Sequence, residues 1–249
     1  MAEHKPAAEM LGYYDAAGTR VAAALHRGDH DAPRIVVMAH GFRSSKIGPS
    51  RYFVGIARAL AARGISTFRF DQPGSGDSEG AFEDSSFLTW TDTIEHFVRR
   101  FAEDGNAVAL LGQSMGGTAT LAAATRLGDA VKGIALWSPD PMLHADPTSM
   151  TGEWMEEEGE RVRPDFWREA ASIDFLALYL ALTSPAYMVF GTADAFIPVE
   201  DIRTVEAARK KGDRIRVVEG LPHSAWADPK RTEIMQETLD FLTAALSAS

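Results

Sequence analysis

The pentapeptide Gly112-Gln113-Ser114-Met115-Gly116 joins two segments of different character. Residues 106–111 before it are mostly apolar, as in a short buried strand, and residues 117–126 after it are rich in alanine, as in a helix. A strand that enters a helix through so tight a turn holds the turn serine in a strained conformation with its hydroxyl exposed. Because a Cβ at either flanking position would crowd the turn, glycine is required there. The pattern predicts Ser114 as a nucleophile.

Composition narrows the class of protein. A chain of 249 residues, 45% hydrophobic and 24% charged, fits one soluble α/β domain with an insertion. The absence of cysteine excludes disulfides, a thiol nucleophile and thiolate metal sites. The net charge of -10 argues against a nucleic-acid partner, since phosphate binding needs clustered lysine and arginine. Residues 1–6 do not resemble a secretory signal, and no apolar run approaches the roughly 20 residues of a membrane helix. We therefore expect a cytoplasmic protein with no membrane partner.

Apolar runs alternate with helical patterns along most of the chain, which predicts βαβ units around a mostly parallel sheet. The chain begins differently, with two short strands around a hairpin turn at 15–18. Later strands are expected at 34–39, 65–70, 106–111, 131–137, 187–190 and 215–218, and helices at 50–62, 86–101, 117–126, 199–211 and 230–245. The alternation stops between Ser138 and Pro185. We therefore divide the chain into a core, 1–138 and 186–249, and a lid at 139–185.

A serine hydroxyl needs a base to take its proton, and the base needs an acid to orient it. Asp194 follows the predicted strand at 187–190, and His223 follows the predicted strand at 215–218. Loops at the carboxyl ends of parallel strands meet at one rim of the sheet, so Ser114, Asp194 and His223 should lie together. The order Ser, Asp, His is the order of the α/β-hydrolases. The backbone N–H groups of Met115 and of Phe42, after the first parallel strand, are the candidate oxyanion donors.

These motifs fall in the order found in one known family. They are His-Gly-Phe at 40–42, Arg-Phe-Asp at 69–71, Gly-Ser-Gly-Asp-Ser at 74–78, the 112–116 pentapeptide, Gly-Thr-Ala-Asp at 191–194 and Gly-Leu-Pro-His at 220–223. Over nearly its whole length the chain resembles the α/β-hydrolases, and most closely the serine aminopeptidase-like and cinnamoyl (feruloyl) esterase group. The resemblance implies Ser114 as nucleophile, His223 as base, Asp194 as acid and the Phe42 and Met115 amides as the oxyanion hole. It also implies a compact lid after Trp137.

Some assignments have competitors. Asp140, Glu200 or Asp201 could replace Asp194 as the acid, although Asp140 is expected at the lid hinge. Gln113 stands where many members of the family have histidine, at a site expected to face the sheet surface rather than the substrate. No His and carboxylate spacing suggests a metal site, and no cofactor is expected.

The lid is rich in large apolar groups, which favours a hydrophobic or aromatic substrate. The predicted substrate pocket contains Trp154, Phe166, Trp167 and Tyr179. Residues 175–182 have no polar face, so a helix there should be covered on more than one side, as an acyl-binding wall, a packed element or a homodimer contact.

We expect a serine carboxylesterase that cleaves an apolar or aromatic acyl ester. An aminopeptidase-like amide hydrolase, an acyl-thioesterase and a non-catalytic small-molecule receptor are the alternatives. The first of these would use a lid carboxylate, such as one of the acidic residues at 156–160, to bind an amine.

Overall fold

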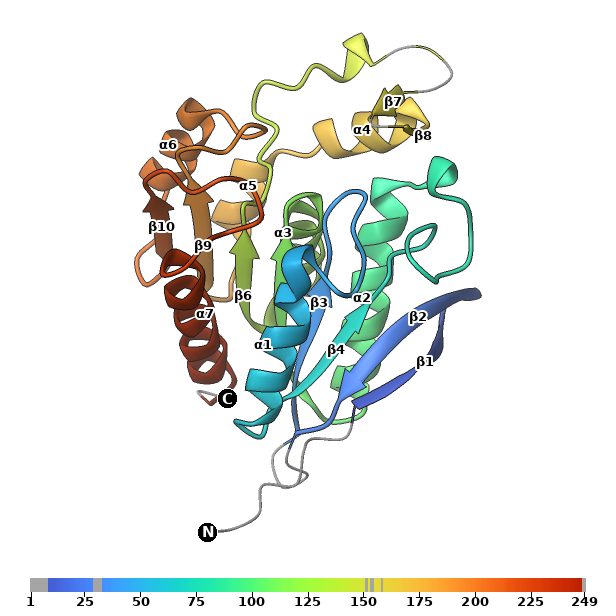
Figure 1. The fold of residues 1–249 in the computed structure, drawn as a ribbon, viewed down its shortest axis with the longest axis vertical. Helices are drawn as coiled ribbons and strands as arrows, with labels where there is room; N and C mark the ends of the chain where they lie inside the picture. Colours follow the sequence, from blue (N-terminus) through green and yellow to red (C-terminus); the bar gives the residue numbers. More distant parts are fainter. Residues whose placement is uncertain (1–8, 29–32, 151, 153–154, 158, 248–249) are drawn as a thin grey trace.

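The computed structural model describes residues 9–28, 33–150, 152, 155–157 and 159–247. Its centre is an eight-stranded sheet in the order β1-β2-β4-β3-β5-β6-β9-β10 (Figure 1). The strands are β1 Glu9–Ala16, β2 Thr19–His26, β3 Arg34–Ala39, β4 Ser66–Phe70, β5 Ala107–Gln113, β6 Val131–Trp137, β9 Ala186–Gly191 and β10 Arg214–Val218. β2 pairs antiparallel with β1 and β4, and all other neighbours are parallel. The predicted hairpin and mostly parallel sheet are confirmed.

Helices cover both faces of this sheet (Figure 1). α1 Tyr52–Ala61 and α7 Lys230–Ser247 lie on one face, and α2 Phe87–Glu103 and α3 Met115–Leu127 lie on the other; α6 Val199–Ala207 connects β9 to β10. The side chains of β3 alternate between two cores. Ile35 and Val37 join the core beneath α2 and α3, whereas Val36 and Met38 join the core beneath α1 and α7. A strand buried on both faces has to be apolar throughout, which explains the run at 34–39.

The segment between β6 and β9 has two parts. β7 Met155–Glu157, β8 Glu160–Val162 and α4 Pro164–Ala171 lie above the carboxyl ends of the strands (Figure 1). α5 Phe175–Ala181 instead packs beside α3, where the Thr125 hydroxyl donates a hydrogen bond to the Leu178 carbonyl oxygen at 3.2 Å. Only the first part is therefore placed where it can cover a site at the rim of the sheet.

The position of α5 corrects one expectation. Phe175 and Tyr179 are buried, but Leu180, which points about 100° away from Tyr179, is 58% exposed. Within one chain, the helix is thus covered along one face and not on a second side, and a homodimer contact on the exposed side stays a prediction. Because α5 lies on the flank of the sheet, it does not form a wall over the strand ends.

Candidate active site

Ser114 lies at the junction of β5 and α3 and has a strained backbone, with φ 54° and ψ -131°. Packing on both sides holds it there. Its N–H donates to the Trp137 carbonyl oxygen at 2.8 Å, which ties the turn to β6. A Cβ on Gly112 would lie 2.5 Å from Thr120 Oγ1, and a Cβ on Gly116 would lie 2.0 Å from the His40 carbonyl oxygen. The two glycines thus let the 112–116 turn approach the start of its own helix and the neighbouring loop.

His223 joins Ser114 to Asp194. Its Nε2 lies 2.8 Å from Ser114 Oγ, and its Nδ1 lies 2.7 Å from Asp194 Oδ2. An ionised carboxylate only accepts hydrogen bonds, so Nδ1 carries the proton and Nε2 is free to accept from the serine hydroxyl. The Asp194 side chain is fully buried, and that of His223 is 13% exposed. A serine, a base and an orienting acid in this geometry can carry out nucleophilic chemistry.

Backbone contacts fix the two loops that carry the acid and the base. The second carboxylate oxygen of Asp194 accepts from the N–H groups of Phe196 at 2.9 Å and Ile197 at 3.0 Å, which orients the side chain. The Ala193 N–H donates to the Leu221 carbonyl oxygen at 3.1 Å, which joins the loop after β9 to the loop after β10.

The other candidate acids have different partners. Asp201 is buried, and its Oδ1 lies 2.9 Å from Nε2 of His144, while Glu200 is exposed. Asp140 follows β6 and accepts a hydrogen bond from the Met142 N–H at 3.0 Å. Burial raises the pKa of Asp140, with the carboxylates of Asp194 and Asp201 adding to that effect. Among these candidates, the structure places Asp194 in contact with the histidine.

The 40–46 loop, which follows β3, approaches Ser114 closely. A Cβ on Gly41 would lie 2.9 Å from both Ser114 Cβ and Gln113 Oε1, so only glycine fits. His40 is fully buried; its Nε2 accepts from the Gln72 N–H at 2.9 Å, so its Nδ1 donates to the Gly41 carbonyl oxygen at 2.8 Å. Burial lowers the pKa of His40, which favours this neutral form. His40 therefore supports the loop.

A cavity of about 360 Å³ opens over Ser114 and His223. Its lining residues are Gly41, Phe42, Arg43, Ser44, Pro49, Gln113, Ser114, Met115, Asp140, Trp167, Phe196, His223 and Ser224. Both candidate oxyanion donors, Phe42 and Met115, thus share the cavity with the serine. The apolar part of the wall comes from Phe42, Met115, Trp167 and Phe196, which suits a hydrophobic group.

The predicted pocket residues have different positions. Trp167 lines the cavity, but Phe166 does not, because it is fully buried against Trp90 and Phe87 of α2. Tyr179 is also absent from the lining: its hydroxyl donates to Asp213 Oδ2 at 2.9 Å on the flank of the sheet. Trp154 lies outside the described residues. The predictions for Phe166 and Tyr179 as pocket residues are wrong.

Sequence reasoning missed several lining residues. Phe196 is 61% exposed and packs edge-on against the His223 ring at 5.0 Å, and its place two residues after Asp194 was the available signal. Gln113, expected to face the sheet surface, lines the cavity instead.

Within the described residues, no cluster of three or more His, Cys, Asp or Glu side chains is arranged for a metal ion. No helix in the same part of the chain combines the length and apolar character needed to cross a membrane.

Comparisons with known proteins agree with this architecture. Est1E from Butyrivibrio proteoclasticus, solved with ferulic acid bound, superposes with a TM-score of 0.82 at 21% identity, covering 95% of this chain and 99% of that one. A monoacylglycerol lipase from Paleococcus ferrophilus gives a TM-score of 0.71 at 19% identity, covering 90% and 99%. At these identities the likeness shows a shared fold, the α/β-hydrolase fold.

Sequence comparison identifies the family. The uncharacterized protein YfhR of Salmonella typhi is 27% identical over 205 residues, a match that covers 76% of this chain and 65% of that protein's length. The sequence model of the family described as serine aminopeptidase, S33, matches residues 30–172, which is more than half of the chain. The protein therefore belongs to the S33 serine aminopeptidase family of α/β-hydrolases.

Proposed function

We propose that the protein is a serine carboxylesterase that cleaves an apolar or aromatic acyl ester through an acyl-enzyme. The observation that carries the proposal is the His223 imidazole, which lies within hydrogen-bond distance of both Ser114 Oγ and Asp194 Oδ2. This arrangement supplies a nucleophile, a general base and an orienting acid. The strained backbone of Ser114 supports the same role, because strain of this kind is concentrated at functional sites.

In the proposed mechanism, Ser114 Oγ attacks the ester carbonyl carbon while His223 Nε2 takes the hydroxyl proton. Asp194 stabilises the imidazolium that forms. The tetrahedral oxyanion is bound by the backbone N–H groups of Phe42 and Met115. His223 then gives its proton to the leaving alcohol, which leaves an acyl group on Ser114. A water molecule, deprotonated by His223, attacks this acyl group and releases the acid.

The walls of the cavity support the assignment of the acyl group. Trp167, Phe42 and Phe196 present aromatic surface beside the serine, and about 360 Å³ accommodates a small aromatic or medium-chain acyl group. Ferulic acid, the ligand bound to Est1E in its structure, is an aromatic acid of this kind. Esters of such acids are the substrates to test first.

One observation favours a second candidate, an aminopeptidase-like amide hydrolase. Asp140 lines the cavity and could bind the ammonium group of a peptide N-terminus. Asp140 Oδ1, however, already accepts the Met142 N–H at 3.0 Å, and burial raises the pKa of this carboxyl, which makes its charged form less favourable than that of an exposed carboxylate. The ester reading is therefore preferred.

The test is a panel of p-nitrophenyl esters of increasing chain length, methyl ferulate, acyl-thioesters and aminoacyl-naphthylamides. The proposal expects a burst of p-nitrophenol equal to the enzyme concentration, and the highest kcat/KM on an aromatic or medium-chain ester. Cleavage of the naphthylamides alone would replace it with the peptidase, and preference for thioesters would replace it with the thioesterase.

A further inference from the structure

The side chain of Phe42 packs against three aromatic rings. Its ring centroid lies 5.0 Å from that of Phe82, 5.0 Å from that of Phe166 and 4.7 Å from that of Trp167. These separations are within the range preferred by packed aromatic pairs. Phe166 and Trp167 both belong to α4, so the helix above the strand ends contacts the residue whose amide is a proposed oxyanion donor.

Polar contacts hold the two ends of the 40–46 loop. At one end, His40 binds the Gln72 N–H. At the other end, Asp71 accepts hydrogen bonds from both the backbone N–H of Lys46 at 2.5 Å and its ammonium group at 2.6 Å. Phe42 lies between these anchors; its ring packs against those of Phe82, Phe166 and Trp167, and the Arg43 guanidinium lies 5.9 Å from its centroid. A backbone hydrogen bond from the Ser44 N–H to the Gly41 carbonyl oxygen at 3.2 Å closes the turn that contains Phe42, and the packing of the Phe42 ring is the further contact that sets the place of this turn.

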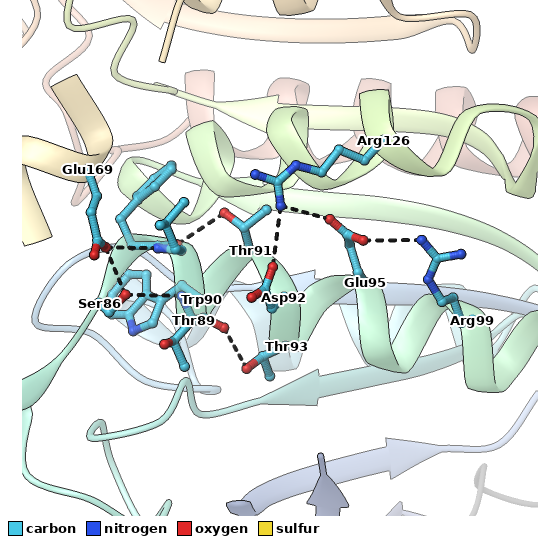
Figure 2. Close-up of polar contacts among 12 residues, drawn as sticks. Ser86, Thr89, Trp90, Thr91, Asp92, Thr93, Glu95, Arg99, Arg126 and Glu169 are labelled. Atoms are coloured by element: carbon cyan, nitrogen blue, oxygen red, sulfur yellow. Dashed lines mark hydrogen bonds and ion pairs between the residues drawn. The ribbon is translucent and has the colours of Figure 1, made fainter. Parts of the chain in front are cut away.

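α4 is itself fixed to the beginning of α2. Glu169 Oε2 accepts from the Ser86 hydroxyl at 2.7 Å and from the Leu88 N–H at 3.1 Å, and Figure 2 shows its carboxylate beside the first turn of α2. A carboxylate is favoured there because the first N–H groups of a helix lack partners within the helix. Near the start of α4, the Arg163 N–H donates to the Glu83 carbonyl oxygen at 3.1 Å.

Phe166 links these two sets of contacts. It is fully buried, with its ring centroid 5.1 Å from that of Trp90 on α2 and 5.0 Å from that of Phe42. Trp167, the next residue, lines the cavity instead. Neighbouring residues on a helix point about 100° apart, so Phe166 supports Phe42 from the core, whereas Trp167 packs against Phe42 and also faces the cavity.

We propose that α4 positions the 40–46 loop, with Phe166 as the positioning residue that holds Phe42 where its amide can bind the oxyanion. This inference rests on the proposed esterase function. Donors stabilise a transition state only when they are in place before the reaction, so a loop that shifts loses rate rather than substrate affinity. Removing Phe166 should therefore lower kcat for every ester by a similar factor, whatever the size of its acyl group.

The experiment compares Phe166→Leu and Phe166→Met with Phe97→Leu. Phe97 is a fully buried aromatic residue on α2 that packs against Phe68 and Phe70. Phe97→Leu therefore removes the same amount of core packing as Phe166→Leu, at a site that does not contact Phe42. The readouts are kcat and KM for p-nitrophenyl acetate, the rate of fluorophosphonate labelling, and the Tm. We expect Phe166→Leu to lower kcat about tenfold or more at nearly constant KM, with methionine restoring much of it because it fills irregular space.

Glu169→Gln provides a second variant if Phe166→Leu does not fold. It weakens the contact between α4 and α2 while leaving the aromatic residues in place, so a smaller fall in kcat at constant KM is expected. An unchanged kcat in a folded Phe166→Leu or Glu169→Gln enzyme would overturn the proposal, as would an equal fall in Phe97→Leu. Failure of the esterase function itself would appear separately, as absence of labelling and hydrolysis in the wild type.

Discussion

Replacing Gly116 with alanine tests how closely the 112–116 turn and the 40–46 loop must approach each other. The added Cβ would lie 2.0 Å from the His40 carbonyl oxygen and 2.6 Å from the His40 carbonyl carbon. Cβ atoms do not approach other heavy atoms closer than about 3.0 Å. Because both partners are backbone in a close-packed interior, either the first turn of α3 or the loop at His40 must retreat by about 1 Å.

That displacement falls between the two proposed oxyanion donors, since Gly116 follows Met115 and His40 precedes Phe42 by two residues. A misplacement of about 1 Å costs on the order of 100-fold in rate, and loss of one oxyanion donor costs about 100- to 1000-fold. We expect Gly116→Ala to lower kcat by about 100-fold. Overpacking should also lower the free energy of unfolding by about 1–3 kcal/mol.

The matched control is the same change at Gly55, an exposed residue within α1 whose added Cβ would lie 3.6 Å from Met235 Cε, an ordinary contact. Gly55→Ala should leave kcat unchanged and raise the free energy of unfolding by up to about 1 kcal/mol, because alanine favours a helix. The assays are p-nitrophenyl acetate hydrolysis and urea unfolding. A folded Gly116→Ala enzyme with kcat within about threefold of the wild type would refute the reasoning.

Three further predictions concern other parts of the molecule. Asp194→Asn should lower kcat by about 10⁴-fold at pH 8, whereas Asp140→Asn should cost less than about tenfold; the opposite ranking would move the acid to Asp140. Trp167→Ala should raise KM for aromatic acyl esters but not for acetate esters, and equal KM changes would remove it from the acyl site. Burial and the nearby Arg69 guanidinium lower the pKa of His26 in the folded state. The contribution of neutral His26 to the free energy of unfolding is therefore fully present above about pH 6.5. It is lost as the pH falls through the lowered pKa, by up to about 1.4 kcal/mol per pH unit. His26→Gln should flatten this decline, measured by urea unfolding at a series of pH values between 5 and 8.

Much of the fold could be predicted because strands buried on both faces leave a continuous apolar signal. The run before Ser114 is β5, and residues 131–137 form β6 with the predicted bounds. The juxtaposition of Ser114, Asp194 and His223 was predictable for a related reason. Each follows a parallel strand, and such strands bring their carboxyl ends to one rim, so backbone topology alone brings the three residues together.

The pocket was less predictable because the face that a helix buries depends on distant partners. Tyr179 turns away from the rim because its hydroxyl meets Asp213 and the Lys210 N–H, about thirty residues further along the chain. Phe166 and Trp167 are neighbours with the same apolar character, yet only Trp167 reaches the cavity. Nothing in the local sequence distinguishes them, since the docking of α4 on α2 decides which side faces inward. A homodimer, and the boundaries of the lid, stay predictions.

The most direct test of the central claim is identification of the residue that a fluorophosphonate probe modifies. After labelling and proteolysis, mass spectrometry should find a single modified peptide carrying the adduct on Ser114. The Ser114→Ala variant should remain unlabelled and should lose p-nitrophenyl ester hydrolysis by a factor of about 10⁴ or more. An adduct on another residue, or a Ser114→Ala variant that hydrolyses esters at the wild-type rate, would contradict the assignment of Ser114 as the nucleophile.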